Sequence, residues 1–147
     1  MTFLPVSLNI TGKKILFVGG GKVASHKLKA LEQFDPDIDI LSIEFSDVIL
    51  NNKYKKIPKK YDSLDLKGYH LVYACTNDEK TNRMIKEDAD KWGLLVNVAD
   101  NPSLCDFISP AILKKEEITI AVGSNARNVK KAIALRDKIA SLLKDDL

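Results

Sequence analysis

The stretch "ILFVGGGKVASHK", residues 15–27, decides the fold of this chain. Four apolar residues, 15–18, lead directly into three glycines, and a helical pattern follows them. Three glycines at the end of a buried strand have two explanations. Either the chain makes a tight structural turn there, or a negatively charged group must approach the backbone.

The spacing of the glycines matches a phosphate-binding pattern. Gly19-x-Gly21-x-x-Ala24 fits the dinucleotide fingerprint G-x-G-x-x-G/A, between a strand and a helix as the fingerprint requires. The first glycine permits the turn, the second lets the backbone touch a pyrophosphate, and the small third residue allows close packing of helix on strand. The N–H groups and the dipole at the helix start attract phosphate. The pattern predicts a nucleotide site, with a ligand-free turn as the alternative.

Three polar residues on later elements are further candidates. Glu44 ends the second expected strand and is a plausible acceptor for ribose hydroxyls, which favours NAD over NADP; a solvated strand-end carboxylate is the alternative. Asn97 lies in an otherwise apolar strand, where it either orients the cofactor or satisfies neighbouring backbone groups. Asn82, on the helix after the third main strand, is open to the same two interpretations.

Short apolar runs alternate with helical patterns along the whole chain. We expect strands at 15–18, 37–44, near 54–57, 70–76, 94–99 and 117–123, and helices at 22–33, 78–93 and about 128–144. This alternation predicts an α/β fold, a Rossmann-like parallel sheet with helices on both faces. The near-continuous apolar strands agree with a sheet that is covered on both faces.

Composition narrows the class of protein. The 147 residues are 45% apolar and 29% charged, as in an ordinary globular domain, and the net charge of +3 is too small to argue for nucleic acid. We expect two free thiols, no signal peptide, no membrane segment and a cytoplasmic setting. Neither His26 nor His70 has a partner at ligand spacing, so we expect no fixed metal site.

Several separated stretches resemble one family. They are "LPVSLNITGKKILFVGGGKVASHKLKAL", "LVYACTNDEKTN", "VNVADNPSLCDFISPAIL" and "ITIAV". Together, from residue 3 to about 122, they resemble the NAD-dependent precorrin-2 dehydrogenases, which include the N-terminal part of siroheme synthase and the bifunctional dehydrogenase–ferrochelatases. The resemblance implies oxidation of precorrin-2 to sirohydrochlorin with NAD as the hydride acceptor. In some members it also implies insertion of iron.

The resemblance implies roles for individual residues. It places beside the cofactor Lys22, Val23, Ile43, Glu44 and Thr76. The functionally important aspartate of the "N-V-x-D" segment falls on Asp100, which follows a strand and so belongs at the ligand-binding edge of the sheet. A carboxylate there would take the proton lost on oxidation or stabilise the cation that forms. Alternatively, Asp100 simply opens the "Asp-Asn-Pro-Ser" turn.

One loop departs from the family pattern. After "ITIAV" the family usually has Ser/Thr–Gly-Gly–Ser-Pro, whereas this chain has "GSNARNV", residues 123–129, so the resemblance does not extend to this loop. The substrate-binding candidates here are Ser124, Arg127 and Asn128. Precorrin-2 carries eight carboxylates, so cations near a helix start would be useful, with a solvated helix face as the alternative.

Family members commonly continue into a further helical domain and dimerise through the segment after their nucleotide domain. By this resemblance we expect an NAD-binding Rossmann domain at residues 1–112 and a short strand–helix dimerisation segment at 113–147. The absence of the helical domain predicts a substrate pocket that is more open than usual unless another chain closes it.

We therefore expect an NAD-dependent precorrin-2 dehydrogenase, with iron insertion left open. Its partners would be precorrin-2 and a second copy of the chain. One alternative is a nucleotide-sensing regulatory domain of the kind attached to potassium transport systems, although these lack the "LPV" opening and the "N-V-x-D" block. The other is a relative that binds tetrapyrrole without oxidising it.

Overall fold

The computed structural model describes residues 1–144, which divide into two compact units. The larger unit is Leu8–Phe107, and the smaller one joins Met1–Ser7 to the chain from Ile108 onward. Within the described residues, no helix is both long enough and apolar enough to cross a membrane.

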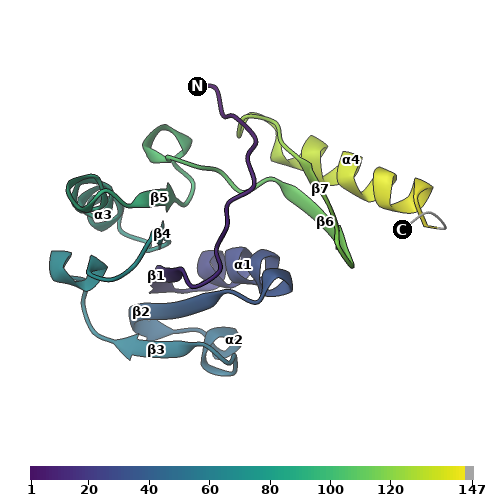
Figure 1. The fold of residues 1–147 in the computed structure, drawn as a ribbon. Coiled ribbons are helices and arrows are strands. Elements are labelled where there is room, and N and C mark those ends of the chain that lie inside the picture. The colour runs from purple at the N-terminus through teal and green to yellow at the C-terminus, as the bar shows by residue number, and fades with distance from the viewer. Residues whose placement is uncertain (145–147) are drawn as a thin grey trace. The chain divides into compact units, whose positions relative to one another are not determined.

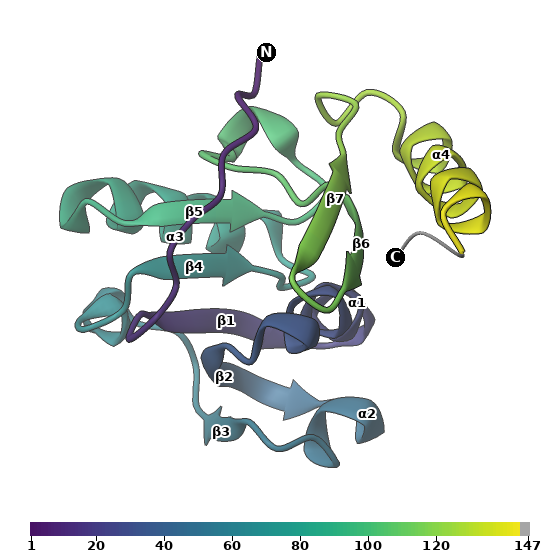
Figure 2. The same ribbon diagram turned by 45° about the vertical axis from the view of Figure 1, so that its right-hand side comes forward.

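A five-stranded parallel sheet forms the centre of the larger unit. Its strands are β1 (Lys14–Gly20), β2 (Asp37–Phe45), β3 (Lys55–Pro58), β4 (Leu71–Ala74) and β5 (Leu95–Val98). They lie side by side in the order β3-β2-β1-β4-β5 (Figure 2). This is the Rossmann order, and the direction of winding reverses between β1 and β4, where such folds bind ligands. The predicted fold class is confirmed.

Helices cover both faces of this sheet. They are α1 (Lys22–Leu31), α2 (Asp47–Leu50) and α3 (Glu79–Trp92), with 3-10 turns η1 (Glu32–Phe34), η2 (Ser63–Leu66) and η3 (Pro102–Leu104) (Figure 1). Successive side chains of β1 point to opposite faces. Phe17 therefore packs in one core with Leu28 of α1, whereas Leu16 packs in the other with Ile85 of α3. Burial on both faces explains why the strands read as continuous apolar runs.

The smaller unit is a β-hairpin with a helix. Its elements are β6 (Ala111–Lys115), β7 (Ile118–Val122) and α4 (Val129–Leu142). The single strand expected at 117–123 is thus the second strand of an antiparallel pair, and β6 was not predicted. Arg136 of α4 donates from Nη1 to the carbonyl oxygen of Ile112 at 3.1 Å, which joins the helix to the hairpin.

Candidate functional site

The three glycines have different structural reasons. Gly19 has a φ of +116°, and a Cβ there would lie 2.4 Å from the carbonyl oxygen of Cys75. A Cβ on Gly20 would lie 2.5 Å from the carbonyl oxygen of Glu44. At Gly21 a Cβ would meet nothing within 4 Å, and the backbone is extended. The fold therefore requires the first two glycines, while the third leaves open space in which another molecule can approach the backbone.

The start of α1 suits an anion. Gly21 is the N-cap residue, no side chain caps the helix, and its first turn contains no acidic residue. The first N–H groups of a helix lack intrahelical partners and carry the positive end of its dipole. Ala24, the small residue of the fingerprint, is fully buried between α1 and the sheet.

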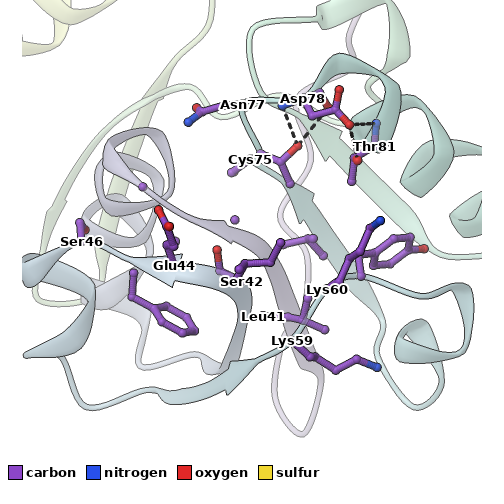
Figure 3. A pocket seen from close by; sticks show the side chains of 18 of the residues that line it. Leu41, Ser42, Glu44, Ser46, Lys59, Lys60, Cys75, Asn77, Asp78 and Thr81 are labelled. Carbon is purple, nitrogen blue, oxygen red and sulfur yellow. Dashed lines mark hydrogen bonds between the residues drawn. The ribbon is translucent and has the colours of Figure 1, made fainter.

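A cavity of about 660 Å³ opens beside the glycine turn. Five of the predicted cofactor residues line it: Gly19, Gly21, Ile43, Glu44 and Thr76. Figure 3 shows Ser42 and Glu44 of β2 on one side of this cavity, with Asn77, Asp78 and Thr81 across from them. Within residues 1–144 the exposed carboxylate of Glu44 forms no hydrogen bond or ion pair, so it is available to a ligand.

A second cavity, of about 290 Å³, lies at the ends of β4 and β5. The candidates from the sequence that line it are Val23, Thr76, Asn82 and Asp100. Asp100 has a φ of +60°, in a turn where the N–H of Asn101 donates to the carbonyl oxygen of Val98 at 3.3 Å. Asp100 thus opens a turn and also borders a cavity. Its carboxylate forms no hydrogen bond or ion pair in the described part of the chain.

Asn77 and Arg83 are among the cavity residues that the sequence analysis missed. Asn77 lines both cavities, and Arg83 lines the smaller one together with Asp100. The guanidinium of Arg83 has no hydrogen-bond or ion-pair partner among residues 1–144. Asn77 lies in the turn after β4 and Arg83 in the first half of α3, and the ends of parallel strands face the ligand site. Their position after a parallel strand was the feature of the sequence that could have identified them.

Two predicted cofactor residues line neither of these cavities. Lys22 is exposed at the first position of α1. Asn97 is 3% exposed, and its Nδ2 donates to the carbonyl oxygen of Phe107 at 2.9 Å. Its Oδ1 has no partner within the described residues. The amide of Asn97 therefore satisfies a neighbouring backbone carbonyl, which is the structural one of the two roles considered from the sequence.

The loop that differs from the family pattern, residues 123–129, precedes and enters α4 in the smaller unit. Asn125 and Ala126, which stand where the resembled family has glycines, have φ values of +50° and +59°. They therefore take the left-handed conformation that glycine favours. Ser124 Oγ accepts the N–H of Asn128 at 3.1 Å, and Asn128 Oδ1 caps the helix by accepting the N–H of Lys131 at 2.9 Å. Arg127 stays exposed.

Burial makes Cys75 unreactive. Burial raises the pKa of its thiol to about 12, with a further raising effect from Asp100 that the cation of Lys27 opposes. The thiol is therefore protonated at neutral pH, and a protonated thiol is a poor nucleophile. Among residues 1–144, no three His, Cys, Asp or Glu side chains gather as a group that could hold a metal ion.

Comparisons with known proteins agree with this geometry. The model of the family described as "Putative NAD(P)-binding" matches residues 6–111. The chain is 32% identical to a siroheme synthase of Nitrosococcus oceani and 35% identical to one of Nitrosomonas eutropha, in each case over 97% of this chain and 31% of the relative. The chain thus spans about a third of the length of these relatives. The resemblance stated from the sequence is confirmed.

The fold also matches a solved structure, named SirC, precorrin-2 dehydrogenase. The two superpose with a TM-score of 0.79 over 95% of this chain and 71% of the other, at 23% sequence identity. At this level of identity the match establishes the shared fold.

Proposed function

The chain belongs to the family described as "Putative NAD(P)-binding", and from this premise we propose that it is the dinucleotide-binding part of an NAD-dependent precorrin-2 dehydrogenase. One observation carries the proposal. The cavity beside the open backbone of Gly21 shares Thr76 and Asn77 with a second cavity, which an unpaired carboxylate, Asp100, borders. The similarity to siroheme synthases supports a tetrapyrrole as the substrate.

The residues of the larger cavity fit a dinucleotide. The open backbone at Gly21, which lines this cavity, suits the pyrophosphate, and so does the adjoining uncapped start of α1 at Lys22 and Val23, although these two residues lie outside the lining of this cavity. Glu44 suits the ribose hydroxyls, and Ile43, which is 70% exposed, offers an apolar surface to the adenine. A carboxylate at position 44 repels a 2′-phosphate, which favours NAD over NADP. When bound, NAD supplies the hydride acceptor.

The smaller cavity suits the reaction itself. Loss of a hydride from a reduced tetrapyrrole leaves a cation that must also lose a proton. We assign the acceptance of this proton, or stabilisation of the cation, to Asp100. The unpaired cation of Arg83 in the same cavity suits a peripheral carboxylate of the substrate. Ser124, Arg127 and Asn128 stay further candidates for substrate contacts.

The proposal extends to organisation and partners. We propose that residues 1–112 form the NAD-binding domain and that 113–147 bind a second copy of the chain. Exposed apolar residues on α4 support this, namely Val129, Ile133, Leu135 and Leu142. The two cysteines are free, which supports a reducing, cytoplasmic setting.

The experiment that tests the function is anaerobic absorbance spectroscopy with freshly generated precorrin-2 and NAD. We expect the wild-type chain to produce the sirohydrochlorin spectrum. Asp100→Asn should lower the rate by about a hundredfold or more, because asparagine tolerates the left-handed backbone but cannot accept the proton. Asp35→Asn is the matched control, since Asp35 is also exposed with a positive φ of 46° but lines neither cavity.

The outcomes separate the alternatives. A flat trace from a wild-type chain that binds NAD would favour the relative that binds tetrapyrrole without oxidising it. Full activity in Asp100→Asn would remove the role assigned to this carboxylate. Equal loss in both variants would indicate damage to the fold rather than to the chemistry.

A further inference from the structure

A short turn connects the two cavities. Thr76 and Asn77 line both of them. The turn follows β4 and ends at Asp78, the N-cap residue of α3. A dinucleotide that occupies both cavities must therefore pass over this turn.

The side chain of Asn82 holds the turn from the α3 side. Asn82 is 7% exposed in the first turn of the helix. Its Oδ1 accepts the backbone N–H of Thr76 at 3.1 Å and the Thr76 hydroxyl at 2.7 Å. Its Nδ2 donates to the Thr76 carbonyl oxygen at 3.0 Å. One amide thus binds both backbone polar groups and the side chain of the same residue.

The bare backbone of Gly19 confines the turn from the β1 side. A Cβ on Gly19 would lie 2.4 Å from the carbonyl oxygen of Cys75 and 2.9 Å from the backbone nitrogen of Thr76. The peptide group between Cys75 and Thr76 is therefore in close contact with β1 on one side. The bonds to Asn82 hold it on the other.

We propose that Asn82 is a positioning residue that fixes the Thr76–Asn77 turn as the bridge over which NAD passes from one cavity to the other. The inference rests on the proposed function, since it takes NAD as the ligand. Asn82 also lines the smaller cavity, but both polar atoms of its side chain are engaged by Thr76. It therefore acts on the ligand through Thr76. The turn also carries Asn77, whose exposed side chain has no hydrogen bond or ion pair within residues 1–144 and is free to contact the ligand.

Calorimetric titration of the full chain with NAD and with AMP tests this inference. AMP needs only the larger cavity and does not cross the turn, so it reports on the rest of the site. Asn82→Ala removes all three bonds. Asn82→Asp has the same size and keeps the acceptors, but it sets a carboxylate oxygen against the Thr76 carbonyl. The control is Asp39→Asn, a buried polar residue of β2 that accepts the Tyr69 hydroxyl at 2.6 Å and lines neither cavity.

We expect both Asn82 variants to bind NAD about tenfold more weakly, a loss of about 1.4 kcal/mol, and AMP within about twofold of wild type. In turnover assays the KM for NAD should rise more than kcat falls. The Asp39 control should lower the melting temperature without changing either affinity. This contrast separates positioning from general stability.

Two results would overturn the inference. One is an Asn82 variant that folds and binds NAD as tightly as wild type. The other is an equal loss of NAD and AMP binding. If Asn82→Ala does not fold, Asn82→Asp decides. Failure of the wild-type chain to bind NAD at all would instead overturn the proposed function on which the inference rests.

Discussion

At the scale of single residues, the glycine triplet combines two requirements that look alike in the sequence. A Cβ on Gly19 would clash with the backbone of Cys75, just after β4, and one on Gly20 would clash with the backbone of Glu44 in β2. A Cβ on Gly21 would meet no other atom of the protein within 4 Å. The sequence alone thus cannot show whether a glycine is needed for packing or for the approach of a ligand, because the packing contacts come from chain segments far away in sequence.

Two alanine substitutions separate these requirements. Gly21→Ala should change the free energy of unfolding by less than about 1 kcal/mol, because its backbone is extended and its surroundings are open. NAD binding should weaken about tenfold or more, since the methyl group occupies the approach to the backbone. Gly19→Ala should destabilise the fold by about 2–4 kcal/mol through its positive φ and the clash with Cys75.

Urea unfolding and calorimetric NAD titration, run on both variants, check this pair of expectations. Gly19→Ala serves as the structural counterpart of Gly21→Ala. An NAD affinity in Gly21→Ala equal to that of the wild type would place the pyrophosphate elsewhere.

At the scale of elements, the sequence predicted the buried parallel strands and missed the first strand of the hairpin. Apolar runs and the fingerprint revealed the parallel strands and α1, because burial on both faces leaves a continuous pattern. The hairpin strand β6 was missed because its turn contains no glycine or asparagine. Glu116 takes a φ of +52° there, and its carbonyl oxygen accepts from Nζ of Lys114 at 2.7 Å. The two cavities were beyond prediction in detail, since they depend on how separate loops meet.

The helix α4 carries a prediction about self-association. Ala132 is buried against the hairpin side, and Ile133 and Leu135 remain 41% and 47% exposed. If these residues bind a second copy, Ile133→Asp with Leu135→Asp should convert the dimer to monomer, because a buried unpaired carboxylate is costly. Ala134→Asp adds the same charge at an exposed position between them and should leave the dimer intact.

Sedimentation velocity over a range of protein concentrations measures this effect. A wild-type chain that remains monomeric throughout would refute the assignment of α4 as the contact between copies.

At the scale of the whole molecule, the burial of a thiol and two tyrosine hydroxyls predicts that the fold loses stability at alkaline pH. Burial raises the pKa of the Cys75 thiol to about 12. It also raises the pKa values of Tyr61 and Tyr69, whose hydroxyls are further held by Asp88 and Asp39. A raised pKa means that the folded state keeps its proton longer than the unfolded state. The stabilisation is therefore complete below the unfolded pKa and is lost as the pH rises towards the folded pKa.

We expect stability to fall from about pH 9 upward, with the Cys75 thiol alone contributing up to about 1.4 kcal/mol per pH unit. Urea midpoints at about pH 7 and at about pH 10.5, which lie below and above the unfolded thiol pKa, measure the loss. Cys75→Ala should be less stable at neutral pH because of the lost packing, but it should lose less stability on alkalinisation. An unchanged pH slope in that variant would show that the tyrosines dominate.

The open space at Gly21 also has a consequence for how this sequence can evolve. Folding constrains positions 19 and 20, whereas the protein's own contacts leave room for a side chain at position 21, where the proposed nucleotide would be what requires glycine. A lineage that stopped using the nucleotide would be expected to keep the first two glycines and to accumulate other residues at the third. Position 21 is therefore the place where relaxed selection would first become visible, long before the fold itself decayed.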